Sequence, residues 1–183
     1  MKRNILIGGA WPYANYLLHI GHLSALLPGD IIARYYRGCN DNVVYVSGTD
    51  AHGTPITQRA RKEGKEPREI AEHYHEEFKK SFLKAEFSYD YYGCTFENYH
   101  KEEVQKLFKL IYDNGYIYEK EQNEDFCPKC SIFLADRDIV GTCPKCGGNA
   151  SGDQCDNCLA SLEATEVLNK KCKICGTETI TKP

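Results

Sequence analysis

Eight of the ten cysteines fall in four Cys-x-x-Cys pairs in the last third of the chain. The pairs are Cys127/Cys130, Cys143/Cys146, Cys155/Cys158 and Cys172/Cys175. A two-residue spacing lets both thiolates of a pair reach one ion from a tight turn, and two pairs complete a closed tetrahedral zinc site. We therefore predict two structural zinc ions. Redox-active dithiols are the alternative, but they require a pair at the start of a helix in a thioredoxin-like setting, which this sequence does not offer.

The spacing leaves open which pairs share an ion. Pairing in chain order leaves gaps of 12 and 13 residues, whereas nested pairing leaves 8 residues between the inner pairs and 41 between the outer pairs. Either way, four thiolates leave no open coordination position for water, so the metal is structural. Because this segment holds few apolar residues, we expect it not to fold without metal. The two isolated cysteines, Cys39 and Cys94, are interpreted as buried, inert thiols.

A second candidate site is a loop that ends in two histidines, His19 and His22. An apolar run, residues 3–8, precedes the loop, and a helix-like pattern follows it. A strand that leads through such a loop into a helix N-terminus makes a site for a phosphate chain. A polar stretch, residues 48–55, follows the next apolar run, residues 42–47. Because ligands in open α/β sheets bind beyond the carboxyl ends of the strands, we expect these two stretches to form one active site.

Periodicity predicts the elements that hold these residues. Helices are expected over residues 21–38, 56–64, 68–86 and 98–114, a turn over residues 89–93, and a strand over residues 116–124. Pro28 should kink or split the first helix, because proline removes an internal hydrogen bond. The last helix has an apolar side that is expected to lie inside, formed by Val104, Leu107, Phe108 and Ile111. His73 and His75 do not share a helix face and are interpreted as solvated.

Composition is that of a soluble globular protein, with 42% hydrophobic and 27% charged residues. The formal net charge of −3 provides no basic field that would support nucleic-acid binding. No apolar stretch is long enough for a signal peptide or a membrane span, so the expected location is the cytoplasm. At 183 residues the chain can hold one ordinary domain with a small attachment. We expect a nucleotide-binding half-domain over residues 1–118 and a zinc-knuckle subdomain over residues 119–183.

Three stretches together resemble the N-terminal part of the methionyl-tRNA synthetases of the two-zinc type. The class I signature is matched by His19-Ile20-Gly21-His22. Two more specific stretches are residues 10–15 (Ala-Trp-Pro-Tyr-Ala-Asn) and residues 48–55 (Gly-Thr-Asp-Ala-His-Gly-Thr-Pro). With the four knuckles, the resemblance covers residues 3–180. It implies an α/β fold, the N-terminal half of a Rossmann-type parallel-sheet catalytic domain with an inserted zinc-knuckle subdomain.

The resemblance implies ATP-dependent activation of methionine to methionyl-adenylate, followed by transfer to tRNA(Met). His19 and His22 are the implied catalytic residues, because they would stabilise charge growing on the α-phosphate. The implied ATP-binding residues are Tyr13, Ala14, Asn15, His19, Gly21 and His22. The implied methionine-binding residues are Ala10, Trp11, Tyr13, Asp50 and His52. Asp50 would hold the α-ammonium in a charge-assisted contact. Mg²⁺ is expected to accompany ATP.

The chain departs from the family at Tyr16 and Leu17, where the family has a glycine and then a small residue or proline. It also stops at Pro183, before the family's KMSKS loop and anticodon-binding domain. We therefore expect little or no aminoacylation by this polypeptide alone. A second polypeptide that supplies the missing half is a further partner to consider.

Two other functions are weighed against this one. The first is a non-catalytic zinc-knuckle module that binds RNA or a protein. The charges around the knuckles are mixed, which does not favour it. The second is a dinucleotide-dependent oxidoreductase. It is excluded, because the sequence lacks a Gly-x-Gly-x-x-Gly turn and its downstream acidic residue.

Overall fold

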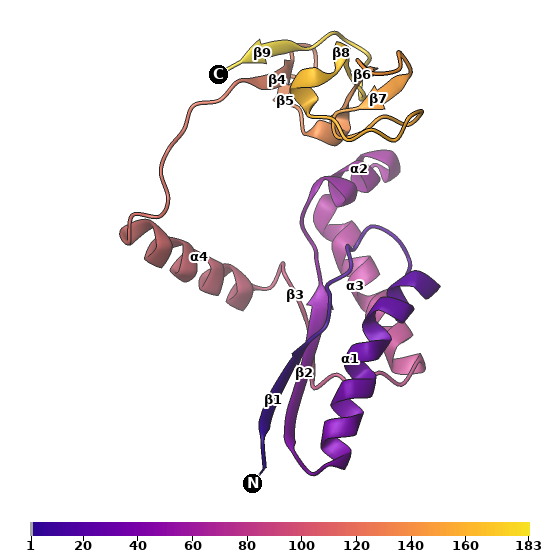
Figure 1. Ribbon diagram of the computed structural model, residues 1–183, viewed down its shortest axis with the longest axis vertical. Helices are drawn as coiled ribbons and strands as arrows, with labels where there is room; N and C mark the ends of the chain where they lie inside the picture. Colours follow the sequence, from indigo (N-terminus) through magenta and orange to yellow (C-terminus); the bar gives the residue numbers. More distant parts are fainter. Residues whose placement is uncertain (1) are drawn as a thin grey trace. The chain divides into compact units, whose positions relative to one another are not determined.

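The computed structural model describes residues 2–183 and divides into two compact units. The first unit ends at Tyr116, and the second spans Ile117–Pro183. The first is α/β and the second is built from short strands and cysteine turns (Figure 1).

The first unit is organised on a parallel sheet of three strands in the order β1-β2-β3 (Figure 1). The strands are β1 (Asn4–Gly8), β2 (Asn42–Thr49) and β3 (Tyr91–Cys94). Residue pairs Ile5↔Val43 and Ser47↔Tyr92 set the register. The predicted β-α-β arrangement of the first two strands is confirmed. The predicted turn at residues 89–93 is wrong, because the backbone from Tyr91 continues as a strand beside the end of β2.

The described part of this unit contains four α-helices. They are α1 (Ile20–Gly38), α2 (Thr54–Glu63), α3 (Pro67–Lys84) and α4 (Asn98–Asp113). Of the kink or split expected at Pro28, the split does not occur, since α1 continues through this residue. Tyr45 supports this region from β2, where its hydroxyl donates to the Leu26 carbonyl at 3.1 Å. A Cβ on Gly29 would stand 2.8 Å from the Tyr45 hydroxyl, so glycine is what lets the ring approach.

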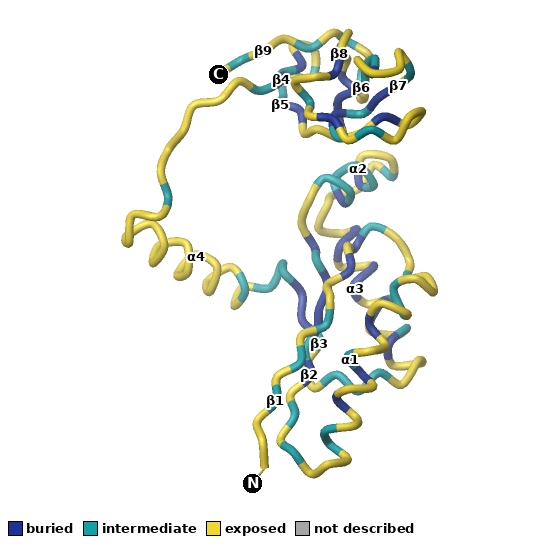
Figure 2. Tube along the Cα trace, viewed as in Figure 1, coloured by how far each residue is buried: buried dark blue, intermediate teal, exposed yellow. Residues whose placement is uncertain are grey.

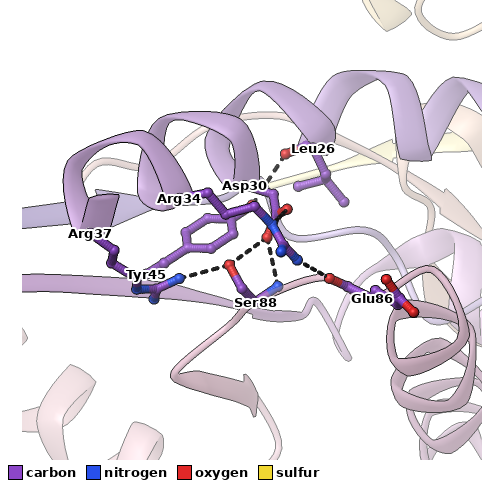
Figure 3. Close-up of polar contacts among 7 residues, drawn as sticks. All are labelled: Leu26, Asp30, Arg34, Arg37, Tyr45, Glu86 and Ser88. Atoms are coloured by element: carbon purple, nitrogen blue, oxygen red, sulfur yellow. Dashed lines mark hydrogen bonds and ion pairs between the residues drawn. The ribbon is translucent and has the colours of Figure 1, made fainter. Parts of the chain in front are cut away.

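A polar network ties α1 to the segment that leads into β3 (Figure 3). The buried Asp30 carboxylate accepts from the Ser88 backbone N–H at 2.6 Å and from its hydroxyl at 2.7 Å. Arg34 donates to the other Asp30 oxygen and also to the Glu86 carbonyl. Burial favours protonation of Asp30, but the hydrogen bonds from Ser88 and Arg34 outweigh it and lower the pKa of Asp30. This network fixes the start of β3 against α1.

The core of the first unit lies largely along α3. Its buried residues include Ile70, Phe78 and Phe82, each at most 3% exposed, and Cys94 at the end of β3 is fully buried. The prediction of a buried Cys94 is therefore confirmed, and burial raises the pKa of its thiol to about 11. Cys39 is exposed, contrary to the prediction, because it caps the solvent end of α1.

The amphipathic helix α4 is present, but its apolar side does not lie inside. No residue of α4 is buried, and Leu107 and Phe108 are 58% and 56% exposed. Figure 2 shows the helix as almost entirely exposed. Periodicity predicted the helix correctly, whereas burial requires a second packed layer that the described residues do not supply.

The second unit contains two antiparallel sheets, in the orders β5-β4-β9 and β7-β6-β8. The strands are β4 (Glu124–Cys127), β5 (Ile132–Phe133), β6 (Ile139–Thr142), β7 (Asn149–Ser151), β8 (Leu168–Cys172) and β9 (Ile180–Lys182). Asp125 on β4 links the strands by accepting from Lys170 at 2.7 Å and from Thr179 at 2.9 Å. The strand predicted over residues 116–124 is wrong, since residues 117–123 are irregular and β4 begins at Glu124.

Candidate functional site

The cysteines gather into two groups of four, each with its sulfur atoms within 4.8 Å of one another. The first group is Cys127, Cys130, Cys172 and Cys175, and the second is Cys143, Cys146, Cys155 and Cys158. The pairing that spacing left open is therefore nested. Cys127 and Cys172 end β4 and β8, two strands of different sheets that the hydrogen bond from Lys170 to Asp125 joins.

Both groups fit a tetrahedral metal ion. Zinc–sulfur bonds of about 2.3 Å place tetrahedral sulfurs about 3.8 Å apart. The Sγ–Sγ distances are 3.4 Å for Cys127–Cys175, 3.9 Å for Cys143–Cys158 and 3.5 Å for Cys146–Cys155. Each group also forms a small core, with Leu134 and Ile139 around the first and Leu162 and Val167 around the second. The two groups could each hold a metal ion, as the sequence predicts.

Hydrogen-bond donors in the knuckle turns favour the thiolate form of two of these cysteines. The Gly148 backbone N–H and the Asn157 side chain approach Cys146 Sγ at 3.4 and 3.6 Å. With Asn157 as the largest contribution, they lower the pKa of Cys146. Thr177 lowers the pKa of Cys175 in the same way. Neighbouring thiols and burial raise the pKa values of Cys130, Cys158 and Cys172, so in each group only one thiol is shifted towards the thiolate that binds metal.

In the first unit, the two signature histidines cap α1. His19 is the N-cap residue, and its Nδ1 accepts from the Gly21 N–H at 3.1 Å. His22 Nδ1 accepts in turn from the His19 N–H at 3.2 Å. Because both Nδ1 atoms are acceptors, each ring carries a proton on Nε2 and can donate it to an oxygen of a ligand. Burial, with a smaller contribution from His19, lowers the pKa of His22, so this ring is neutral at pH 7.

The loop before α1 is bound along the end of β2 by backbone hydrogen bonds. The Asp50 N–H donates to the Pro12 carbonyl, and the Ala14 N–H donates to the Asp50 carbonyl, both at 2.9 Å. Tyr13 and Asp50 form a parallel bridge there, and Ala14 is fully buried. The two stretches that the sequence singled out are thus brought together beyond the carboxyl ends of β1 and β2.

Thr95, which follows β3, holds the segment after Asp50. Its hydroxyl accepts from the Ala51 N–H at 2.8 Å, and its carbonyl lies 3.2 Å from His52 Nε2. The His52 N–H donates to Asp50 Oδ1 at 3.2 Å, which orients the carboxylate. Sequence reasoning missed Thr95, because the end of β3 was itself read as a turn.

Trp11 packs against the backbone of the central strand. A Cβ on Gly48 would come within 2.3 to 2.6 Å of three Trp11 ring atoms, and one on Gly93 would stand 3.6 Å from the ring. The Trp11 ring therefore covers glycines at the ends of β2 and β3. Tyr13 approaches Gly53 nearby, at 3.5 Å from a Cβ built there. The two aromatic rings thus approach glycines on either side of Asp50 in the sequence.

Tyr16 contacts α2. The Arg59 guanidinium lies 4.9 Å from the centre of the Tyr16 ring, within cation–π distance, and Glu63 holds Arg59 at 2.5 Å. The large Tyr16 side chain thus connects the loop before α1 to helix α2.

His75 corrects a sequence prediction. It was interpreted as solvated, but it is 7% exposed, and its Nδ1 lies 2.8 Å from Thr49 Oγ1. His73 is exposed, as predicted. The signal was present in the sequence, since His75 follows Ala71 by four residues and precedes Phe78 by three, which places it on the apolar stripe of α3.

Comparison with known protein families shows which family this chain belongs to. Residues 5–183 match the family model described as tRNA synthetases class I (M). The chain belongs to this family. The α/β fold predicted for this synthetase chain, with a parallel sheet and cysteine clusters that could form zinc knuckles, is confirmed by the structure and its relatives.

Several curated relatives of this class I synthetase are similar in sequence. It is 57% identical over 175 residues to methionine–tRNA ligase 1 of Alkaliphilus oremlandii (strain OhILAs), covering 96% of this chain and 32% of the relative. It is 53% identical over 173 residues to methionine–tRNA ligase of Bacillus mycoides (strain KBAB4), covering 94% and 32%. The chain thus spans about a third of the length of these relatives.

A solved structure is also similar to this synthetase chain. The LeuRS–tRNA–LeuAMS ternary complex from Agrobacterium radiobacter K84 matches with a TM-score of 0.65 and 25% identity, covering 82% of this chain and 20% of that one. Among residues 2–183, no helix is both long and apolar enough to cross a lipid bilayer.

Proposed function

We propose that the chain supplies the ATP-signature half of a methionine–tRNA ligase active site and two structural zinc sites. The observation that carries the proposal is the pair of backbone hydrogen bonds that hold the loop before α1 against Asp50. They hold the loop that leads into α1 against the backbone of Asp50, which supports a site formed by the N-terminus of α1 and the Asp50 carboxylate. The reaction is the activation of methionine by ATP and transfer of the methionyl group to tRNA(Met).

In this proposal the Nε2–H groups of His19 and His22 donate to the triphosphate and stabilise charge on the α-phosphate as pyrophosphate leaves. Gly21 follows the N-cap and leaves room for the adenine ring, while Asn15 and the backbone of Tyr13 and Ala14 line the same loop. Mg²⁺ bound with ATP would neutralise part of the phosphate charge. No residue acts as a nucleophile, so catalysis is positioning and electrostatics.

The Asp50 carboxylate accepts the α-ammonium group of methionine in this proposal. It is half-buried and already oriented by the His52 N–H. Trp11 and Tyr13 cover the apolar part of the amino acid, and Ala10 and His52 flank them. A deaminated analogue would leave the carboxylate without its partner, so an amino acid is preferred.

We also propose that the exposed apolar side of α4 is covered by the remainder of the catalytic domain. Four residues supply this side, namely Val104, Leu107, Phe108 and Ile111, and they are 36% to 58% exposed. Relatives have about two-thirds of their length outside the matched region. That remainder, on the same or a second polypeptide, would supply the lysine-bearing loop.

We place the boundary of the nucleotide-binding half near residue 118 and the enzyme in the cytoplasm.

Isothermal titration of the chain with a non-hydrolysable methionyl-adenylate analogue tests the half site. We expect binding that Asp50→Ala weakens by at least tenfold, because a charge-assisted contact is lost. His73→Ala, an exposed histidine on α3, is the matched control and should leave binding unchanged. No binding by the unaltered chain would contradict the proposal.

ATP–pyrophosphate exchange with methionine tests the need for the other half. We expect no exchange by the chain alone. Robust exchange would show that the half site is sufficient. If tRNA binds while ATP and the analogue do not, the zinc-knuckle RNA-binding module becomes the better function.

A further inference from the structure

The buried His75 has no part in the site described so far, yet it contacts the strand that carries Asp50. Its Nδ1 lies 2.8 Å from the hydroxyl of Thr49, which is fully buried and is the last residue of β2. Asp50 is the next residue. His75 therefore reaches, from α3, the point at which β2 gives way to the candidate site.

The Thr49 hydroxyl is held from a second direction by β3. It donates to the Tyr92 hydroxyl at 3.2 Å. Since a hydroxyl has one hydrogen, Thr49 Oγ1 then accepts from His75 Nδ1–H. The His75 ring also stacks on Tyr92, with ring centres 5.8 Å apart and planes at 15°, and meets the edge of Phe96 at 5.9 Å. This packing fixes the ring plane, and with it the direction of Nδ1.

The backbone conformation at Thr49 determines where the adjacent Asp50 lies. Successive side chains of a strand point to opposite faces, so Thr49 points towards α3 while Asp50 faces the other way. The Thr49 carbonyl accepts from the Thr95 N–H at 3.1 Å, and the Asp50 backbone holds the loop through Pro12 and Ala14. A twist at Thr49 would therefore move the carboxylate and loosen the loop together.

We propose that His75 is a positioning residue: by donating to Thr49 it fixes the end of β2, so that the Asp50 carboxylate and the loop at residues 10–15 keep their places. His75 touches no substrate. The effect on methionine rests on the proposed function, whereas the effect on the Asp50 and Ala14 backbone does not.

The competing explanation is that His75 only fills space in the core. Two substitutions separate the explanations. His75→Leu keeps apolar volume and removes the donor, while His75→Asn places an amide nitrogen near the position of Nδ1 and can restore the hydrogen bond to Thr49. Phe78→Leu, a core truncation on the same helix, is the control for general destabilisation.

Amide hydrogen exchange measured by NMR on the full chain tests the positioning directly. In His75→Leu we expect the Asp50 and Ala14 amides to exchange about tenfold faster, the factor expected for one net hydrogen bond. His75→Asn should restore slow exchange, and Phe78→Leu should not single out these two amides. Unchanged exchange in His75→Leu, or no difference between Leu and Asn, would overturn the inference.

Titration with the methionyl-adenylate analogue tests the consequence for the ligand. We expect His75→Leu to weaken binding about tenfold and His75→Asn to recover it, following the exchange data. If the unaltered chain binds no analogue, the proposed function fails while the exchange result still stands. If the analogue binds equally to all variants although exchange changes, the positioning of Asp50 has no consequence for substrate and that part is wrong.

A measurement on the unaltered chain covers the case in which His75→Leu does not fold. We expect the ¹⁵N spectrum of the His75 imidazole to show a neutral ring with its proton on Nδ1. A ring protonated on Nε2 alone would contradict donation to Thr49.

Discussion

The two units of the chain are stabilised in different ways. The first buries aromatic and aliphatic side chains of α1, α3 and the parallel sheet, such as Leu26, Ile70 and Phe78. The second has two small clusters in which cysteines are themselves the central buried residues. One unit folds by removing apolar surface from water, and we expect the other to require metal at its two cysteine groups, each of which could hold an ion. This difference predicts that the two units unfold under different treatments.

Metal removal should have the largest effect and should be confined to the second unit. Structural zinc contributes about 10 to 16 kcal/mol to small thiolate domains. We expect a strong chelator to abolish the dispersed amide signals of residues 124–182 in NMR spectra. The helical circular dichroism signal should persist, because all α-helices of the described residues lie in the first unit. A loss of helix on chelation would break the comparison.

Single-cysteine variants sharpen the nested pairing. We expect metal analysis to find two zinc ions per chain, one for each cysteine group. Cys143→Ser should remove the ion of the inner group only, so NMR signals around Leu162 should broaden while those around Leu134 remain. Loss of order around Leu134 instead would favour pairing in chain order.

Truncation of the hydrophobic core should act on the first unit alone. Phe78 is 1% exposed, and Phe→Ala substitutions at such positions cost about 3 to 5 kcal/mol. We expect Phe78→Ala to lower the urea midpoint followed by helical circular dichroism, with zinc content unchanged. The exposed Phe108→Ala on α4 is the matched control and should shift the midpoint little.

Removing the Asp30 charge should have a smaller effect on the same unit. Its carboxylate accepts two hydrogen bonds from Ser88 (Figure 3), and hydrogen bonds to charged groups contribute about 1.5 to 3 kcal/mol. We expect Asp30→Asn to lower the urea midpoint by less than Phe78→Ala does. An equal or larger loss would show that polar contacts, not core packing, dominate here.

Mild acid should produce the smallest effect. Burial, with a further contribution from Lys79, lowers the pKa of His75 in the folded chain, and burial and His19 lower that of His22. The unfolded chain therefore takes up these protons first as the pH falls below about 6.5. The free energy of unfolding of the first unit should decrease from there down to the folded-state pKa values. His75→Asn should show a shallower decrease, and an identical pH profile would contradict a buried neutral ring.

Local sequence features predicted the secondary-structure elements better than the long-range contacts between them. The βαβ unit and the two cysteine groups follow from apolar runs and from Cys-x-x-Cys spacing. The nested pairing did not follow from the sequence, because both sets of gaps are compatible with knuckles, and only the long-range folding that gathers the sulfur atoms decides between them. β3 was missed, because Tyr-Asp-Tyr-Tyr-Gly favours a turn locally, while pairing with β2 is a long-range contact.

The same limit applied to the site. His19, His22 and Asp50 were found because their spacing carries the signature. Thr95 and Thr49 act through backbone and hydroxyl contacts across strands, and nothing in their local sequence marks them. The burial of His75 was predictable from its place on the apolar stripe of α3, whereas its two-residue spacing from His73 bears only on shared metal binding. Periodicity could not show that α4 is exposed, since an apolar side of a helix does not indicate whether another element covers it.

The ring that rests on Gly48 gives the molecule an optical reporter. Trp11 is the only tryptophan in the chain and is 37% exposed. Its indole borders the proposed amino-acid pocket, so any ligand that displaces water there changes the polarity around a single fluorophore. Emission colour and quenching by iodide can therefore follow occupancy without a label. A β-carbon at position 48 would push the ring outwards and shift that emission to the red.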